Sequence, residues 1–138
     1  MYMEDLFMNV QVRYYSRSGN TKAVADAIAK AAGVSAISVD QVNAAISESV
    51  DVLFIGGALY AYGLDSHMKD YLNALDGSKV KKAAIFSTSW ISKHSLDLIR
   101  KGLMEKGIQV EAETFYVKSK PNETQLKDAA AFAEKFIS

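Results

Sequence analysis

One stretch of the chain, Val52-Leu53-Phe54-Ile55-Gly56-Gly57, is apolar at every position. A strand with one face in water alternates apolar and polar residues, so an unbroken run is typical of a strand covered on both faces, as in parallel sheets. The run Ala83 to Phe86 repeats this pattern. Parallel neighbours are joined by long crossover connections, usually helices. These two runs therefore predict an α/β fold with a buried parallel sheet.

The rest of the chain supplies the other elements. Strands are predicted over residues 7–15, 36–39, 52–57, 83–86 and 109–117. Helices are predicted after Thr21 up to Gly33, weakly from Gln41 to Ser47, after Gly63 up to Gly77, after Trp90 up to Gly107, and from a cap at Asn122. The inward positions of the last three are Met68, Tyr71, Leu72 and Leu75; Leu96, Ile99, Leu103 and Met104; and Leu126, Ala130, Ala133 and Ile137.

Five strands alternating with five helical segments predict a single doubly wound domain over residues 1–138, a common size for one domain. The two most apolar strands belong beside the first one. The short second strand and the fifth, where Glu111 and Glu113 fall on one side, belong at the edges. We therefore expect a five-stranded parallel sheet in the order 2-1-3-4-5, with helices on both faces.

The first strand runs directly into a polar loop, Ser16-Arg17-Ser18-Gly19-Asn20-Thr21, and a helix follows at once. A helix start leaves backbone N–H groups unpaired and carries partial positive charge, so it binds anions. The loop matches neither G-x-x-x-x-G-K-[ST] nor G-x-G-x-x-G. An ordinary helix cap needs only one such polar residue. Four of them together with Gly19 predict a site for one terminal phosphate.

The same residues carry a family resemblance. Tyr14-x-Ser16-x-x-Gly19-x-Thr21-x-x-x-Ala25-x-x-Ile28 is similar to the fingerprint with which the flavodoxin family binds the phosphate of FMN. Two positions depart from the family pattern: Arg13 stands where an apolar residue is usual, and Gln11 is unusual in a strand buried on both faces. The resemblance implies FMN as the cofactor.

Two further loops are expected at the same edge of the sheet, and both carry aromatic residues. The resemblance implies that the isoalloxazine ring lies between them. Trp90 is at the matching place for one face of the ring, and either Tyr60 or Tyr62 supplies the other, unless these aromatics only pack on neighbouring loops. The expected cofactor-binding residues are Ser16, Arg17, Ser18, Gly19, Asn20, Thr21, Ala58, Leu59, Tyr60, Ala61, Tyr62, Gly63, Ser87, Thr88, Ser89 and Trp90.

Composition narrows the functional classes. Lys plus Arg and Asp plus Glu number 16 each, so there is no basic surface for nucleic acid. The chain has no Cys, and His67 and His94 are isolated, so no metal site is expected. No apolar run reaches the roughly 20 residues that span a bilayer, and the N-terminus is acidic rather than basic. A cytoplasmic monomer is expected.

The leading hypothesis is an FMN-binding electron-transfer protein that shuttles electrons between redox protein partners, with no catalytic side chain of its own. A small FMN-dependent oxidoreductase of the quinone or protoporphyrinogen type is the alternative. A flavin-free binding module, supported by Gln11 and Arg13, is a third. Acidic surroundings lower the potential of many flavodoxins; this chain is neutral, with Lys93 and His94 after Trp90, which predicts a less reducing flavin.

Overall fold

The computed structural model describes residues 8–60, 63–89 and 92–137. Its main sheet is parallel, and the strand order is β2-β1-β3-β6-β7, with β8 also paired to β6. The strands of this sheet are β1 (Val10–Tyr14), β2 (Ala36–Ser38), β3 (Val50–Gly57), β6 (Val80–Thr88), β7 (Gln109–Val110) and β8 (Phe115–Val117). Since β7 and β8 share the last position, the order 2-1-3-4-5 predicted from the sequence is confirmed.

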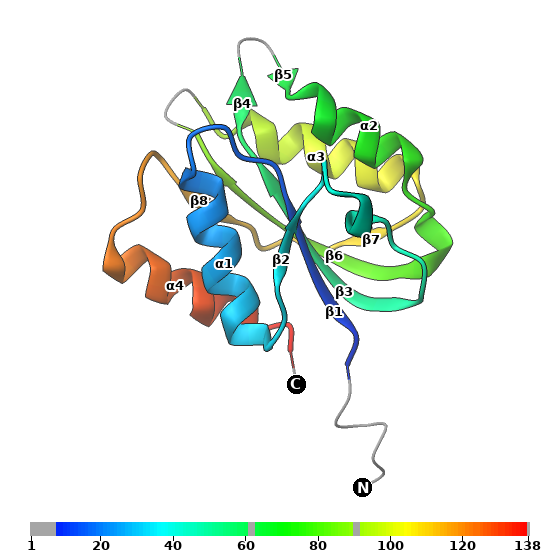
Figure 1. The fold of residues 1–138 in the computed structure, drawn as a ribbon, viewed down its shortest axis with the longest axis horizontal. Helices are drawn as coiled ribbons and strands as arrows, with labels where there is room; N and C mark the ends of the chain where they lie inside the picture. The colour runs from blue at the N-terminus through cyan, green and yellow to red at the C-terminus, as the bar shows by residue number, and fades with distance from the viewer. Residues whose placement is uncertain (1–7, 61–62, 90–91, 138) are drawn as a thin grey trace, which may run out of the picture.

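Helices cover both faces of the sheet. They are α1 (Asn20–Ala32), α2 (Ser66–Ala74), α3 (His94–Glu105) and α4 (Glu123–Glu134), with 3-10 turns at η2 (Val42–Ala44) and η3 (Gly77–Lys79). Figure 1 shows α1 and α4 on one side of the sheet and α2 and α3 on the other. The connections after β1, β3 and β6 all emerge at one edge, which is the carboxyl edge of the parallel strands.

Strand β3 is central, as its uninterrupted apolar sequence predicts. Its alternate side chains belong to two different cores: Val52 and Phe54 pack under α1 and α4, while Leu53 and Ile55 pack under α2 and α3. All four are fully buried. The period of two along a strand thus divides one apolar run between two layers, and neither face needs polar residues.

The fifth predicted strand, Gln109–Val117, is wrong as one continuous element. It is interrupted between β7 and β8, both of which pair with β6. In the interruption Glu111 pairs with Lys82 at 3.7 Å, and Glu113 pairs with Lys135 at 2.7 Å. Both glutamates thus have a lysine partner where the chain leaves the ladder, Lys82 on β6 and Lys135 after α4, and interruptions are common at sheet edges.

The predicted helix from Gln41 to Ser47 is also wrong. Only the single 3-10 turn η2 forms, and in it Val42 is fully exposed while Ala44 is buried. Four of its seven residues are apolar, but Val42 and Ala45 are exposed and only Ala44 is fully buried, so they form no continuous buried face, from which most helical stability in proteins comes. The β2-to-β3 crossover therefore contains no α-helix.

Two predicted helix faces differ in detail. Met104 is 60% exposed on α3, although Leu96, Ile99 and Leu103 are buried as predicted. Helix α4 buries Ala129, Phe132 and Ala133, whereas Leu126, Ala130 and Ile137 are only half-buried. Its orientation is set by Phe132, whose ring meets those of Phe54, Phe115 and Phe136 at centroid distances of 5.2 to 6.1 Å.

Gly56 and Gly57 at the end of β3 provide a matched test of this packing. A Cβ on Gly56 would lie 2.3 Å from ring carbons of Phe86, whereas a Cβ on Gly57 would meet nothing closer than Met68 Cε at 3.6 Å. We expect Gly56→Ala to lower the free energy of unfolding by about 1–3 kcal/mol, because overpacking a closed core is costly. Gly57→Ala should be neutral within about 0.5 kcal/mol. Urea unfolding of the flavin-free protein measures both; equal effects would contradict the packing described for Phe86.

Candidate functional site

The loop after β1 is held in shape by its own hydroxyl groups. Ser16 Oγ accepts a hydrogen bond from the N–H of Gly19 at 2.9 Å, and Ser18 Oγ accepts one from Asn20 N at 3.3 Å. Gly19, the residue before α1, has φ of 93°, a left-handed conformation that favours glycine. Each serine that accepts still has its O–H to donate. The loop therefore presents hydroxyl donors beside the open N-terminus of α1, where an anion binds.

Thr21 joins this loop to the end of β6. Its Oγ1 lies 2.7 Å from Thr88 Oγ1, and both residues are buried. Strands β1 and β6 are not neighbours, because β3 runs between them. The Thr21–Thr88 hydrogen bond therefore fixes the first and third predicted loops relative to one another across the end of β3.

Arg17 joins the same loop to the start of α2. Its Nη2 and Nε donate to Asp65 Oδ2 at 2.5 and 3.0 Å, and the guanidinium lies 4.0 Å from the ring centroid of Tyr60. The Tyr60 hydroxyl in turn accepts a hydrogen bond from the backbone N–H of Arg17 at 3.0 Å. The carboxylate is 5% exposed and the arginine side chain 56% exposed. Tyr60 therefore contacts the loop expected to bind phosphate, and Arg17 covers its ring from one side.

Asp65 is the centre of a small polar cluster. It caps α2 by accepting from His67 N at 2.8 Å, and His67 Nδ1 lies 2.7 Å from Asp65 Oδ1. The imidazole stacks on Tyr15 with ring centroids 4.6 Å apart. Burial alone would raise the pKa of Asp65, but the hydrogen bonds from His67 and Arg17 outweigh it and lower that pKa. Asp65 is therefore an ionised carboxylate at neutral pH.

Burial raises the pKa of the Tyr60 phenol, against the opposing effect of the Arg17 N–H and guanidinium. This phenol is therefore neutral near pH 7, and it can accept from Arg17 and donate elsewhere through the same oxygen.

The loop after β3 contains a small hairpin. Strands β4 (Leu59–Tyr60) and β5 (Gly63–Leu64) pair antiparallel, a structure that the prediction of a plain loop missed. Ala58, Leu59, Tyr60 and Gly63 lie in or beside it. The predicted site residues Ala61, Tyr62 and Trp90 lie outside the described residues.

The three hydroxyls at the end of β6 have different surroundings. Ser87 faces the α3 side, where its Oγ donates to Gly57 O at 2.6 Å and lies 2.5 Å from Ser95 Oγ. Thr88 faces α1 and meets Thr21. Ser89 Oγ is buried and has no hydrogen-bond partner among the described residues. A buried hydroxyl without a partner is costly, so this atom is suited to a ligand's polar group at the sheet edge.

A parallel sheet, a helix start at the end of β1 and two further loops at the same edge together form the arrangement in which open α/β sheets bind their ligands, at a topological switch point. Residues 11–130 match the family model described as "Flavodoxin domain". The chain belongs to the flavodoxin family, a class of FMN-binding electron-transfer proteins.

Individual relatives agree with this assignment. A putative diflavin flavoprotein A 2 of Thermosynechococcus vestitus is 28% identical, over 92% of this chain but only 24% of that protein. Flavodoxin 1 from Bacillus cereus superposes with a TM-score of 0.76 at 23% identity, covering 94% of this chain and 97% of that one. Rubredoxin:oxygen oxidoreductase from Desulfovibrio gigas gives 0.78 at 17% identity, covering 94% and 35%. The chain thus spans about a quarter of the curated relative.

The described residues fit FMN. Ser16 and Ser18 each keep a hydroxyl hydrogen to donate at the N-terminus of α1, which suits a phosphate, and Ser89 Oγ, which has no partner among the described residues, could hydrogen-bond a polar group of the cofactor. None of the helices in the described part of the chain is long and apolar enough to cross a membrane. Among those same residues, no group of three or more His, Asp or Glu side chains is arranged to hold a metal ion.

Sequence reasoning missed the part of the site that links its loops. Asp65 directly precedes α2, where an Asp is a preferred cap, so its capping role was readable from the sequence. Its ion pair with Arg17, 48 positions away, was not. His67 is isolated in the sequence, and nothing in the spacing of His67 and Tyr15 shows that their two rings stack.

Asp65→Asn tests the ion pair while keeping a good helix cap. A lowered folded-state pKa means that the carboxylate stabilises the fold above the unfolded-state value of about 3.9, and that this contribution is lost as pH falls through the folded-state pKa. We expect the variant to lose about 1–2 kcal/mol of unfolding free energy at pH 7. The difference from the unmodified protein should shrink as the pH falls below the unfolded-state value of about 3.9, and urea titrations across pH 2–8 measure it.

The exposed acid Asp70 lies on the same helix, and Asp70→Asn is the matched control. It should change the free energy of unfolding by less than about 0.5 kcal/mol at every pH. A deficit in Asp65→Asn that stayed constant down to pH 2 would show that the carboxylate charge is not the stabilising feature.

Proposed function

We propose that the chain is a single-domain, monomeric carrier of the cytoplasm that binds one FMN at the carboxyl edge of its sheet and passes electrons between protein partners. The observation that carries this proposal is the loop before α1, where Gly19, two accepting serines and the helix N-terminus converge. The phosphate would be held by Ser16, Ser18, Asn20 and Thr21. The ring would lie between the loops after β3 and β6.

Short connections support a carrier over an enzyme. The chain passes from β3 to α2 within Ala58–Asp65 and from β6 to α3 within Ser89–Lys93. The first of these connections contains the small β4–β5 hairpin. Connections of this length leave the edge of a bound ring open to a partner rather than enclosing a substrate. The flavin supplies the redox chemistry, and the chain supplies binding, orientation and electrostatics.

The surroundings of the third loop support a less reducing flavin than that of acidic flavodoxins. Lys93 is exposed, with its Nζ 5.3 Å from the Tyr116 ring, and His94 opens α3 with its Nδ1 3.9 Å from Asp97. Positive charge near the ring favours the anionic reduced flavin and so raises its potential. A partner would then meet a surface of mixed sign.

The absorption spectrum of the purified protein, taken before and after addition of FMN and then dithionite, tests the proposal directly. Bound oxidised flavin with quenched fluorescence, reducible by dithionite, is the expected result. A protein that leaves added FMN fully fluorescent rejects both the carrier and the small oxidoreductase and leaves the flavin-free binding module.

Gly19→Ala and Gly33→Ala form a matched pair for the phosphate site. Both glycines have positive φ, and a Cβ at either would meet nothing within 4 Å. Each substitution should cost about 1 kcal/mol of stability from backbone strain alone. Only Gly19→Ala should lower the affinity for FMN, by about tenfold or more, because the added Cβ would lie where the phosphate approaches the loop amides. Fluorescence titration with FMN measures the affinity of both variants. Equal affinities would contradict the placement of the phosphate at this loop.

Lys93→Glu tests the electrostatic argument. Reversing one exposed charge near the ring should lower the hydroquinone potential by about 10–40 mV, the equivalent of an exposed ion-pair interaction. Lys101→Glu, an exposed residue of α3, is the control and should shift the potential less. A spectroelectrochemical titration at low ionic strength measures both. Equal shifts in the two variants would show that only the net charge of the protein affects the potential. A hydroquinone potential of the unmodified protein as low as that of acidic flavodoxins would contradict the predicted less reducing flavin.

A further inference from the structure

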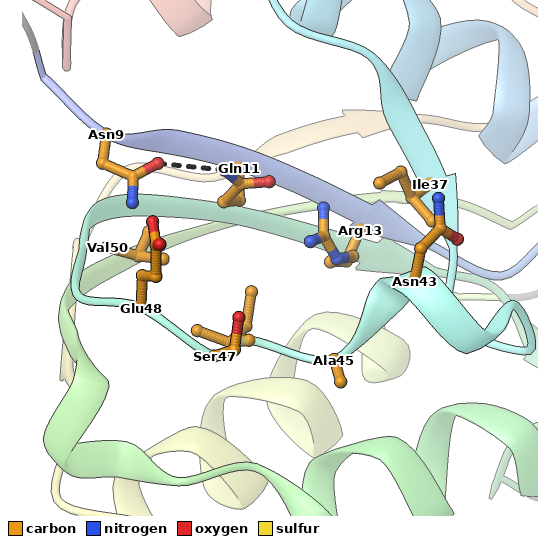
Figure 2. Close-up of a pocket in the computed structure, with 10 residues that line it drawn as sticks. Asn9, Gln11, Arg13, Ile37, Asn43, Ala45, Ser47, Glu48 and Val50 are labelled. Carbon is orange, nitrogen blue, oxygen red and sulfur yellow. Dashed lines mark hydrogen bonds between the residues drawn. The ribbon is translucent and has the colours of Figure 1, made fainter.

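Strand β1 has two chemically different faces. Val10, Val12 and Tyr14 lie in the core under α1 and α4. Asn9, Gln11 and Arg13 line a pocket on the other face, where Gln11 Nε2 donates to Asn9 Oδ1 at 2.9 Å (Figure 2). The two residues that departed from the family pattern, Gln11 and Arg13, are therefore lining residues of a polar pocket rather than flaws in a buried strand.

The pocket exists because the β2-to-β3 crossover contains only the turn η2 and no α-helix. The pocket, with a cavity volume of about 220 Å³, lies beside the segment that follows η2, and Asn43, Ser47 and Glu48 complete its polar lining. Figure 2 places Glu48 at the end of the pocket away from Arg13. A space of this size is well above the roughly 10–15 Å³ that one water needs, so it can admit a small organic ligand.

Arg13 is the unusual group here. It is 3% exposed, its Nε donates to Ala44 O at 2.7 Å and its Nη1 to Val12 O at 3.1 Å. Those bonds use two of the five N–H donors of a guanidinium, and Arg13 also interacts with the phenol of Tyr71, where it opposes the rise in pKa that burial causes. Among the ion pairs of the described residues, none includes Arg13. A buried cation without a counter-charge is costly, and a carboxylate in the pocket would supply that charge.

We propose that this pocket binds a small polar monocarboxylate, with the carboxylate on the Arg13 guanidinium and the polar remainder toward Gln11, Asn43 and Ser47. The Glu48 side chain, at the end of the pocket away from Arg13, would repel a second carboxylate on the ligand, so the ligand carries only one acid group. The site lies on the face of β1 away from α1 and is independent of FMN.

Titration of the full chain with sodium glycerate, followed by the NMR signal of Arg13 Nε–H and the side-chain amides of Gln11 and Asn43, tests the proposal. Glycerate has seven non-hydrogen atoms, and glycerol at equal ionic strength is the probe without a carboxylate. We expect saturable shifts confined to the pocket with glycerate and none with glycerol. Shifts that fail to saturate, or that appear instead at residues 16–21, overturn the proposal.

Arg13→Met should lower the affinity for glycerate by about tenfold or more. Arg13→Lys, which keeps the charge but loses the planar guanidinium, should lower this affinity less. Arg100→Met on α3 is the matched control and should leave binding unchanged. If Arg13 only anchors Ala44, Arg13→Met loses stability while the unmodified protein shows no glycerate binding, and the proposal fails. The unmodified protein's titration decides the question even if Arg13→Met does not fold.

The role of Glu48 has its own test. Malonate, which carries two carboxylates on seven non-hydrogen atoms, should bind the unmodified protein more weakly than glycerate. Glu48→Gln should raise the affinity for malonate by about two- to fivefold, which is the range for one exposed charge interaction. Malonate binding that is as tight as glycerate binding and unaffected by Glu48→Gln would overturn the restriction to a single acid group.

Discussion

The parallel pairing of β3 with β1 and β6 is the constraint on which the rest of the structure depends. Backbone groups in the middle of two apolar layers have no water to bond, so they must bond to neighbouring strands. Parallel pairing then sends every connection across a face of the sheet and brings the carboxyl ends of the strands to one edge. Three loops that are distant in the sequence meet there for that reason, before any contact between their side chains is considered.

Side-chain contacts then fix those loops to one another. Thr21 meets Thr88 across the end of β3, and Arg17 meets Asp65 at the start of α2. Both contacts begin in the loop that precedes α1, so that loop is tied on two sides. A loop held in this way loses less conformational freedom when an anion binds to it, and more of the binding energy is retained as affinity.

Patterns that depend on local chemistry were readable from the sequence, and those that depend on distant partners were not. The unbroken apolar run of β3 predicted the buried parallel sheet correctly, and the polar loop at Gly19 pointed to the family to which the chain belongs. The predictions of a continuous fifth strand and of a helix after Gln41 were wrong. Both rested on short runs of apolar residues, and the sequence does not show which neighbouring elements pack against such runs. The link between Arg17 and Asp65, and the reason for Arg13 in a central layer, appear only when the chain is folded.

The interruption between β7 and β8 also bears on how the molecule behaves in a crowded solution. A long, flat outer strand offers a row of free N–H and C=O groups to which another chain can add, which is the first step of polymerisation. Here the outer position is held by two short strands, and the interruption carries Glu111 and Glu113, each close to a lysine. A strand from another chain would meet an interrupted edge with charged side chains at the interruption. The break between β7 and β8 therefore protects this side of the sheet from templated self-association.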